Sequence, residues 1–212
     1  MQQIRFMARP GARLGERVDR SAWIGAVSEP DPDTGDAVTA TVAIRRGDRE
    51  LVDPGETMQG GDILQVVIRT TPEVPLMAAA LWVGAVSTDT KDRLQAMEAA
   101  LYRGIACVVA GGPVAAVRHA LNHVAKDVGG EWTPRPIIRR SICSLDGGAS
   151  VDARRRLVTG QRLMVGLRLD RPGTAVPRSK GASEAGLAGI GCLQTVMATP
   201  AGPVILTRIA ED

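Results

Sequence analysis

A β-hairpin pattern that occurs twice is the strongest constraint on how this chain folds. Residues 52–69 (VDPGETMQGGDILQVVIR) align without gaps to residues 151–168 (VDARRRLVTGQRLMVGLR), 99 positions later, with six identities over 18 positions. Apolar residues alternate in both copies after a glycine, as expected for a turn that leads into a half-buried strand. We interpret the repeat as a duplicated β-module, with convergence of two similar hairpins as the alternative.

The segment between the two copies contains patterns typical of helices as well as strands. A strand-like stretch at 78–86 is followed by capping residues, by a helix expected to reach Arg103 and stop at Gly104, and by an apolar run at 105–110 that fits a buried strand. Pro113 then opens a second helix, and residues 136–143 resemble another strand. The sequence therefore predicts an α+β fold, in which two related β-hairpin modules flank a central βαβαβ unit. The predicted domains are residues 1–75, 76–143 and 144–212.

A second similarity, between residues 22–28 and 81–87, has an offset of 59 positions. The two offsets exclude one simple tandem duplication of the whole chain. At least one similarity is therefore accidental, or an insertion interrupts the repeat.

The composition narrows the classes of function. Aromatic residues make up 2% of the chain, so few rings are available to stack on bases, which argues against nucleic acid as a partner. Three cysteines without a C-x-x-C spacing argue against a disulfide framework or a thiolate zinc site, and we predict no cofactor. We expect no membrane partner and no signal peptide, and a cytoplasmic or particle-assembled location.

Two histidines one helical turn apart are the first candidate site. His119 and His123 are the only histidines, and Asp127 continues the same row on the second predicted helix. A metal could use these three ligands if a neighbouring subunit covered the face. The alternative is a solvated polar face.

Gly111 and Gly112 precede the same helix directly after an apolar run. Backbone amides in such a turn can receive a phosphate or carboxylate, which makes them a candidate anion-binding site. A plain turn into the helix is the alternative, because Pro113 lacks an amide donor.

A glycine-rich segment near the C-terminus reads SKGASEAGLA and contains Ser179, Lys180 and Ser183. A buried lysine can activate a serine nucleophile. The ten residues resemble the serine loop of ring-opening amidohydrolases, the cyanuric acid hydrolase and barbiturase family. The resemblance implies hydrolysis by a serine of this loop.

Arginine supplies almost all of the positive charge, and it clusters on both hairpins. The first hairpin, residues 42–66 (VAIRRGDRELVDPGETMQGGDILQV), carries Arg45, Arg46 and Arg49. Its arginine turn and its Pro-Gly, then Gly-Asp-Ile-Leu, order resemble the C-terminal ligand-binding module of potassium-conductance regulators. The second hairpin carries Arg154, Arg155 and Arg156. We predict that these six residues form an interaction surface for an acidic protein partner, or edges that discourage strand association.

Taken together, these features favour a self-assembling structural or interaction protein without catalytic activity, such as a homo-oligomeric shell, ring or virion component. The alternative is a small hydrolase or ligand-binding enzyme. It would use the Ser179–Ser183 loop, or a metal held by His119 and His123 at an interface.

Overall fold

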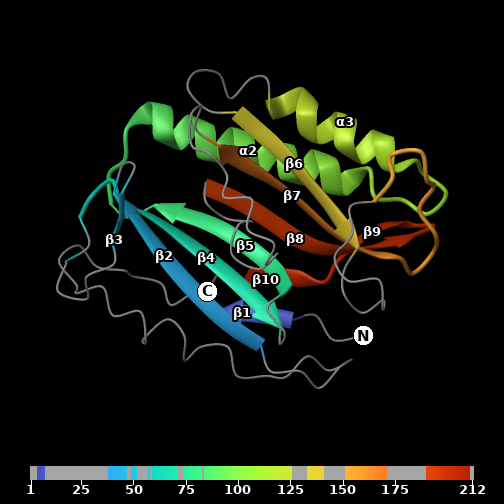
Figure 1. The fold of residues 1–212 in the computed structure, drawn as a ribbon, viewed down its shortest axis with the longest axis horizontal. Helices are drawn as coiled ribbons and strands as arrows, with labels where there is room; N and C mark the ends of the chain where they lie inside the picture. The colour runs from blue at the N-terminus through green and yellow to red at the C-terminus, as the bar shows by residue number, and fades with distance from the viewer. Residues whose placement is uncertain are drawn as a thin grey trace, which may run out of the picture.

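The protein is described by a computed structural model, which places residues 4–7, 38–46, 49–51, 57, 59–70, 74–82, 84–125, 133–140, 151–170 and 190–210. This part of the chain forms a mixed α/β structure with one large antiparallel sheet and two helices (Figure 1). The sheet has the order β3-β2-β4-β5-β8-β7-β6, with β9 paired to β8 beside this path, and β1 pairs with β10 in parallel. The elements are β1 (Ile4–Met7), β2 (Val38–Arg46), β3 (Arg49–Leu51), β4 (Ile63–Thr70), β5 (Val74–Trp82), α2 (Thr88–Ala106), α3 (Val114–Ala125), β6 (Thr133–Arg140), β7 (Arg162–Asp170), β8 (Ile190–Thr199), β9 (Gly202–Ile205) and β10 (Thr207–Ala210).

The repeated segments occupy matching places in this sheet. Their C-terminal parts are β4 and β7, and each strand follows a turn with a left-handed glycine, Gly61 (φ 94°) in one and Gly160 (φ 81°) in the other. Such a φ is costly for residues with a β-carbon, which explains why both copies keep glycine there. The sheet order is correspondingly symmetric, with β2-β4-β5 on one side and β8-β7-β6 on the other.

The predicted combination of helices with antiparallel strands is confirmed. The arrangement as two flanking hairpin modules and the three domain boundaries stay predictions, although one sheet takes strands from all three predicted ranges. The central unit lacks its predicted middle strand, because α2 is followed by α3 without a strand between them. The first copy of the 22–28 similarity lies outside the described residues.

Helix α2 is longer than its sequence predicts. Ser87 caps its N-terminus, because the Ser87 hydroxyl accepts a hydrogen bond from the Thr90 amide at 3.2 Å, and the helix continues past Gly104 to Ala106. The expected strand at 105–110 is therefore wrong, because Ile105 is buried as part of the apolar helix face. Gly104 allows α2 to lie close to α3, since a β-carbon there would lie 2.6 Å from Leu121 Cδ2 and would require that side chain to shift.

The main core lies between these helices and the β6–β9 part of the sheet (Figure 1). Leu163, Val165 and Leu167 of β7 face the helices and join Met97 and Leu121 in one buried cluster. The aliphatic composition therefore suffices to fill this layer. Neither helix that the structure describes is long and apolar enough to span a bilayer.

Candidate functional site

Five residues on five neighbouring strands stand in line across the middle of the sheet. The strand register pairs Val67 of β4 with Ala78 of β5, Ala78 with Leu193 of β8, Leu193 with Gly166 of β7, and Gly166 with Ile137 of β6. Directly paired residues have neighbouring side chains on the same face of a sheet. We call these five positions the sheet-centre row.

The sheet-centre row faces away from α2 and α3. Side chains alternate along a strand, so positions 164 and 166 of β7 point opposite to Leu163 and Val165, which face the helices. Met164 indeed packs in a separate apolar cluster with three members of the row, while Ile137 packs against its side. The row is thus the apolar centre of the second face of the sheet.

The row lies where the two halves of the sheet meet. Among the described residues, β5 and β8 share one paired position, Ala78 with Leu193. Val67 and Gly166 lie on either side of this pair and stand 99 residues apart, the same offset as the sequence repeat. The row therefore marks the junction of the two repeated halves.

A buried glutamine forms hydrogen bonds across the same junction. Gln65 on β4 donates from Nε2 to the Gly191 carbonyl oxygen at 2.7 Å, and its Oε1 accepts from the Gly191 amide at 2.9 Å. The side-chain amide thus satisfies both main-chain groups of a β8 residue. A buried amide left without these bonds would cost free energy, so Gln65 fixes how the two halves join.

Arginines surround the row on β6 and β7. Arg135 is paired with Arg168, and Arg139 is paired with Met164, so these side chains share the face of the sheet-centre row. Arg162 stands two positions before Met164 and has the same orientation. Arg135 and Arg139 are exposed, Arg162 is half-buried and Arg168 is buried. We call these four residues the β6–β7 arginine face.

The described residues do not form a metal centre. Protein zinc sites use three or four His, Cys, Asp or Glu ligands, and no group of three such residues occurs in the described part of the chain. In the sheet-centre row the side chains are hydrocarbon, or absent at Gly166. The residues present therefore do not fit a catalytic metal.

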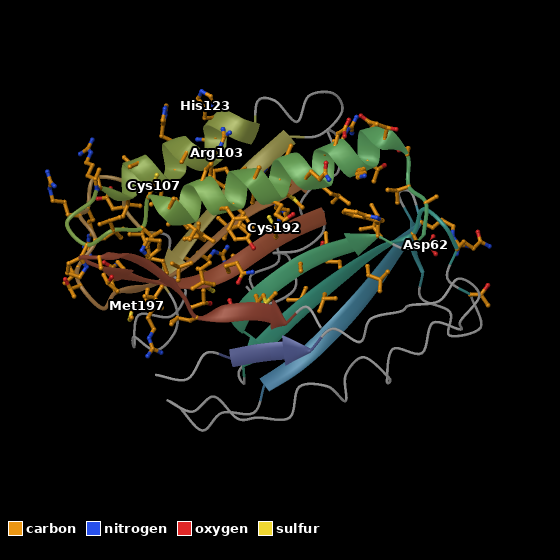
Figure 2. All side chains as sticks on the ribbon, turned by 180° about the vertical axis from the view of Figure 1, so that it is seen from behind. Asp62, Arg103, Cys107, His123, Cys192 and Met197 are labelled. Carbon is orange, nitrogen blue, oxygen red and sulfur yellow. The ribbon has the colours of Figure 1, made fainter. Side chains whose placement is uncertain are left out.

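Cys192 is also unsuited to nucleophilic catalysis. Burial raises the pKa of its thiol to about 12, and its Sγ lies 3.7 Å from the Met97 carbonyl oxygen, beneath α2 (Figure 2). A thiol attacks as the thiolate, which this environment disfavours at neutral pH. Cys192 is therefore a core residue.

The predicted histidine pair exists on α3. His119 and His123 are exposed, with ring centroids 6.3 Å apart and ring planes at 62°, and Figure 2 shows His123 on the outer side of the helix layer. Asp127 lies outside the described residues. A metal held at an interface by this row stays a prediction.

The two glycines before α3 and the arginine turn, predicted as separate sites, are in contact. The Gly111 amide donates to the Leu157 carbonyl oxygen at 2.7 Å, the Gly112 amide donates to the Val109 carbonyl oxygen at 2.9 Å, and Arg156 Nη1 donates to the Gly111 carbonyl oxygen at 2.7 Å. Both amides already have acceptors within the chain, and anion binding there remains a prediction. The side chains of Arg154, Arg155 and Arg156 are exposed, and their interaction role is likewise untested.

On the first hairpin, Arg46 has a structural partner. Its Nε and Nη2 donate to the two carboxylate oxygens of buried Asp62, at 2.8 and 2.9 Å. Burial by itself would raise the pKa of Asp62, but hydrogen bonds from Arg46 and from the Gln59 amide hold that pKa below its usual value. Arg45 and Arg49 are described only as strand backbone, on β2 and β3. The loop with Ser179, Lys180 and Ser183 lies outside the described residues.

Neither the sheet-centre row nor the β6–β7 arginine face was predicted from the sequence. The sequence pattern that could have indicated the arginine face is the pair of arginines at alternate positions on either side of an isoleucine on β6. The row itself has no local signal, because long-range pairing of β5 with β8 brings its members together.

This architecture is the pita-bread aminopeptidase fold. The chain resembles a dipeptidase from Mycobacterium ulcerans (TM-score 0.65, 16% identity) over 94% of its length and 53% of that protein. It also resembles a prolidase from Thermococcus sibiricus (TM-score 0.65, 14% identity) over 95% of its length and 54% of that protein. A methionine aminopeptidase from Thermotoga maritima matches with a TM-score of 0.58 at 15% identity, covering 79% of this chain and 72% of that one. No protein-family model and no curated sequence matches the chain.

The expectation of a non-catalytic structural protein, such as a shell, ring or virion component, is wrong. The solved structures that the chain resembles include aminopeptidases, prolidases and dipeptidases. Turn-rich repeated hairpins suggested assembly, but here they build the two halves of one peptidase-like sheet. The likeness favours the alternative, a small hydrolase or ligand-binding enzyme, over that expectation.

Proposed function

We propose that this chain recognises peptides or peptide-like ligands on the face of the sheet opposite to α2 and α3. The observation that carries the proposal is the extent of the fold: 94–95% of the chain superposes on a dipeptidase and a prolidase. Because the likeness spans nearly the whole chain, the sheet face is retained along with the scaffold. Function still depends on the residues that occupy that face.

The exposed part of the β6–β7 arginine face is the proposed contact surface. Arg135 and Arg139 flank the half-buried Ile137 on one strand, so two guanidinium groups border an apolar side chain. Guanidinium groups form bidentate, charge-assisted hydrogen bonds with carboxylates. This arrangement suits a peptide with an acidic side chain, or its C-terminal carboxylate, next to an apolar residue.

The edge of the sheet supports side-chain recognition over strand addition. β6 is the last strand in the sheet order and contains Pro134 and Pro136, which have no amide to donate. The Val151 amide already donates to the Ile138 carbonyl oxygen of this strand, at 3.4 Å. A peptide that added itself as a further strand would find few free partners there.

A charge-reversal pair tests this proposal. Binding of fluorescent peptides with acidic or amidated C-termini is measured by anisotropy for the wild type, for R135E/R139E, and for the matched control K91E/R103E on the exposed side of α2. Each hydrogen bond to a charged group contributes about 1.5–3 kcal/mol, so we expect R135E/R139E to lose at least about tenfold in affinity. The control has the same charge change on another exposed surface and should bind nearly normally.

Two results would contradict the proposal. One is the absence of measurable binding to any peptide in the set by well-folded wild-type protein. The other is equal weakening in both variants, which would indicate a general effect of net charge. Circular dichroism confirms that each variant is folded, and mass spectrometry of the same mixtures reports whether a bound peptide is cleaved.

A further inference from the structure

The junction between the two halves of the sheet is filled by hydrocarbon. Exposed fractions are 4% for Val67, 1% for Ala78 and 3% for Leu193, and Met164 is equally buried beside them. A metal centre at this junction would need oxygen, nitrogen or sulfur ligands that point into it. The sheet-centre row offers none of these at any of its five positions.

Gly166 makes one position of the row inaccessible to any ligand side chain. A β-carbon there would lie 2.5 Å from the Cys192 carbonyl oxygen and 2.7 Å from Leu193 Cδ1. The nearest of these atoms belongs to the main chain of β8, which is held in register with β7 along the whole strand. A carboxylate or imidazole at 166 would therefore require a shift of the sheet backbone.

The halves also approach each other closely at this point. Ala78 has a small side chain opposite Leu193, and Gln65 bonds across the junction to Gly191. Close contact, apolar burial and a satisfied polar bridge are the properties of a packed core. A hydrolytic centre would instead need an open coordination position with room for water.

We infer that the sheet centre is a closed apolar junction that holds no metal ion, so the chain recognises peptides without metal-dependent hydrolysis at this position. The inference rests on the proposed function for its peptide ligand. Its structural part, the absence of a metal at the junction, depends only on the residues of the row.

Metal content and peptide cleavage are measured on the full chain, purified without chelator and then incubated with Mn²⁺, Co²⁺ or Zn²⁺. Elemental analysis after desalting is expected to show no stoichiometric metal, and mass spectrometry is expected to show no cleavage that EDTA abolishes. The H119A/H123A variant is measured in parallel to identify any metal bound on α3. Metal that disappears in this variant is bound at the helix and leaves the inference intact. One ion per chain that persists in it, together with EDTA-sensitive cleavage, would overturn the inference.

Substitutions in the row provide a readout that does not depend on activity. Val67→Asp and Val67→Asn introduce side chains of equal size, of which only the aspartate is a strong metal ligand. Both should lower the melting temperature by about 5 °C or more, and added metal should restore neither. If a divalent metal restored the melting temperature of Val67→Asp but not that of Val67→Asn, other metal ligands would have to lie near position 67. That result would contradict the inference.

The proposed function and this inference can fail separately. Peptide binding is titrated on protein treated with EDTA, whereas metal content and cleavage are measured on metal-loaded protein. Loss of all peptide binding would refute the proposed function and leave the apolar junction unchanged. Metal-dependent cleavage would refute the inference and leave peptide recognition in place.

Discussion

Replacement of Gly166 by alanine tests how tightly the sheet centre is packed. The new β-carbon would lie 2.5 Å from the Cys192 carbonyl oxygen and 2.7 Å from Leu193 Cδ1. Both neighbours are buried on β8, and one is main chain, so the strands must separate by several tenths of an ångström. Overpacking of this kind costs about 1–3 kcal/mol, and the main-chain contact places the cost at the upper end.

Alanine also has a favourable effect that must be subtracted. Glycine in a strand interior is less stable than alanine by about 0.5–1 kcal/mol, because the unfolded glycine chain is more flexible. The net loss for Gly166→Ala is therefore about 2 kcal/mol, or roughly 4–8 °C in melting temperature for a chain of this size. Gly191→Ala is the matched control on the adjacent strand. Its β-carbon would meet the Leu167 carbonyl oxygen at 3.4 Å, an ordinary contact.

Urea denaturation followed by far-ultraviolet circular dichroism measures both variants against the wild type. Gly166→Ala should unfold at lower urea concentration, whereas Gly191→Ala should match or slightly exceed the wild type. Equal stability of the two variants would refute the argument, because it would mean that β7 and β8 can separate freely at the junction.

Three further predictions concern groups away from that glycine. Gln65→Leu should lower the free energy of unfolding by about 2–4 kcal/mol in urea titrations, because two main-chain groups of β8 lose their hydrogen bonds. A loss below roughly 0.5 kcal/mol, which is the size expected for a neutral surface substitution, would contradict the bridging role of Gln65. Because the pKa of Asp62 is lowered by its ion pair with Arg46, its contribution to stability is complete above the unfolded-state pKa of about 3.9 and disappears as the pH falls below it. The difference in melting temperature between wild type and Asp62→Asn should therefore shrink on acidification, and a constant difference would argue against the ion pair. Cys192, with a pKa of about 12, should resist iodoacetamide at about pH 8 in the folded protein while the partly exposed Cys107 reacts, as peptide mapping would show; rapid labelling of Cys192 would mean that α2 opens.

Local patterns in the sequence predict much of the secondary structure. The β-branched run of β4 and the capping serine of α2 specify their elements through backbone preferences that act over a few residues. The strand predicted at residues 105–110 is wrong because a short apolar stretch fits a buried strand and a buried helix end equally well. Packing against α3, where Ile105 and Leu121 join one buried cluster, favours the helix, and that packing is not local.

The candidate site was less predictable for the same reason. Val67, Ala78 and Leu193 are ordinary apolar residues in the sequence, and only the register of β4, β5 and β8 aligns them. The sequence does show residues whose side chains could bind a ligand, such as His119 and His123, and these lie on the exposed surface of α3. Residue types with reactive or ligand-binding side chains can thus be identified from the sequence. The apolar residues at the centre of the sheet can be identified as a group only from the strand pairing.

The bridge from Gln65 to Gly191 also has a consequence for folding kinetics. The bonded residues are 126 positions apart, so the chain must close a very long loop before the bond stabilises anything, and the entropy of closure opposes it. The hairpins β4–β5 and β6–β7 can form earlier from closer neighbours, whereas the union of the halves must wait for most of the chain. We expect slow refolding with late protection of the Gly191 amide from hydrogen exchange, because high contact order slows folding.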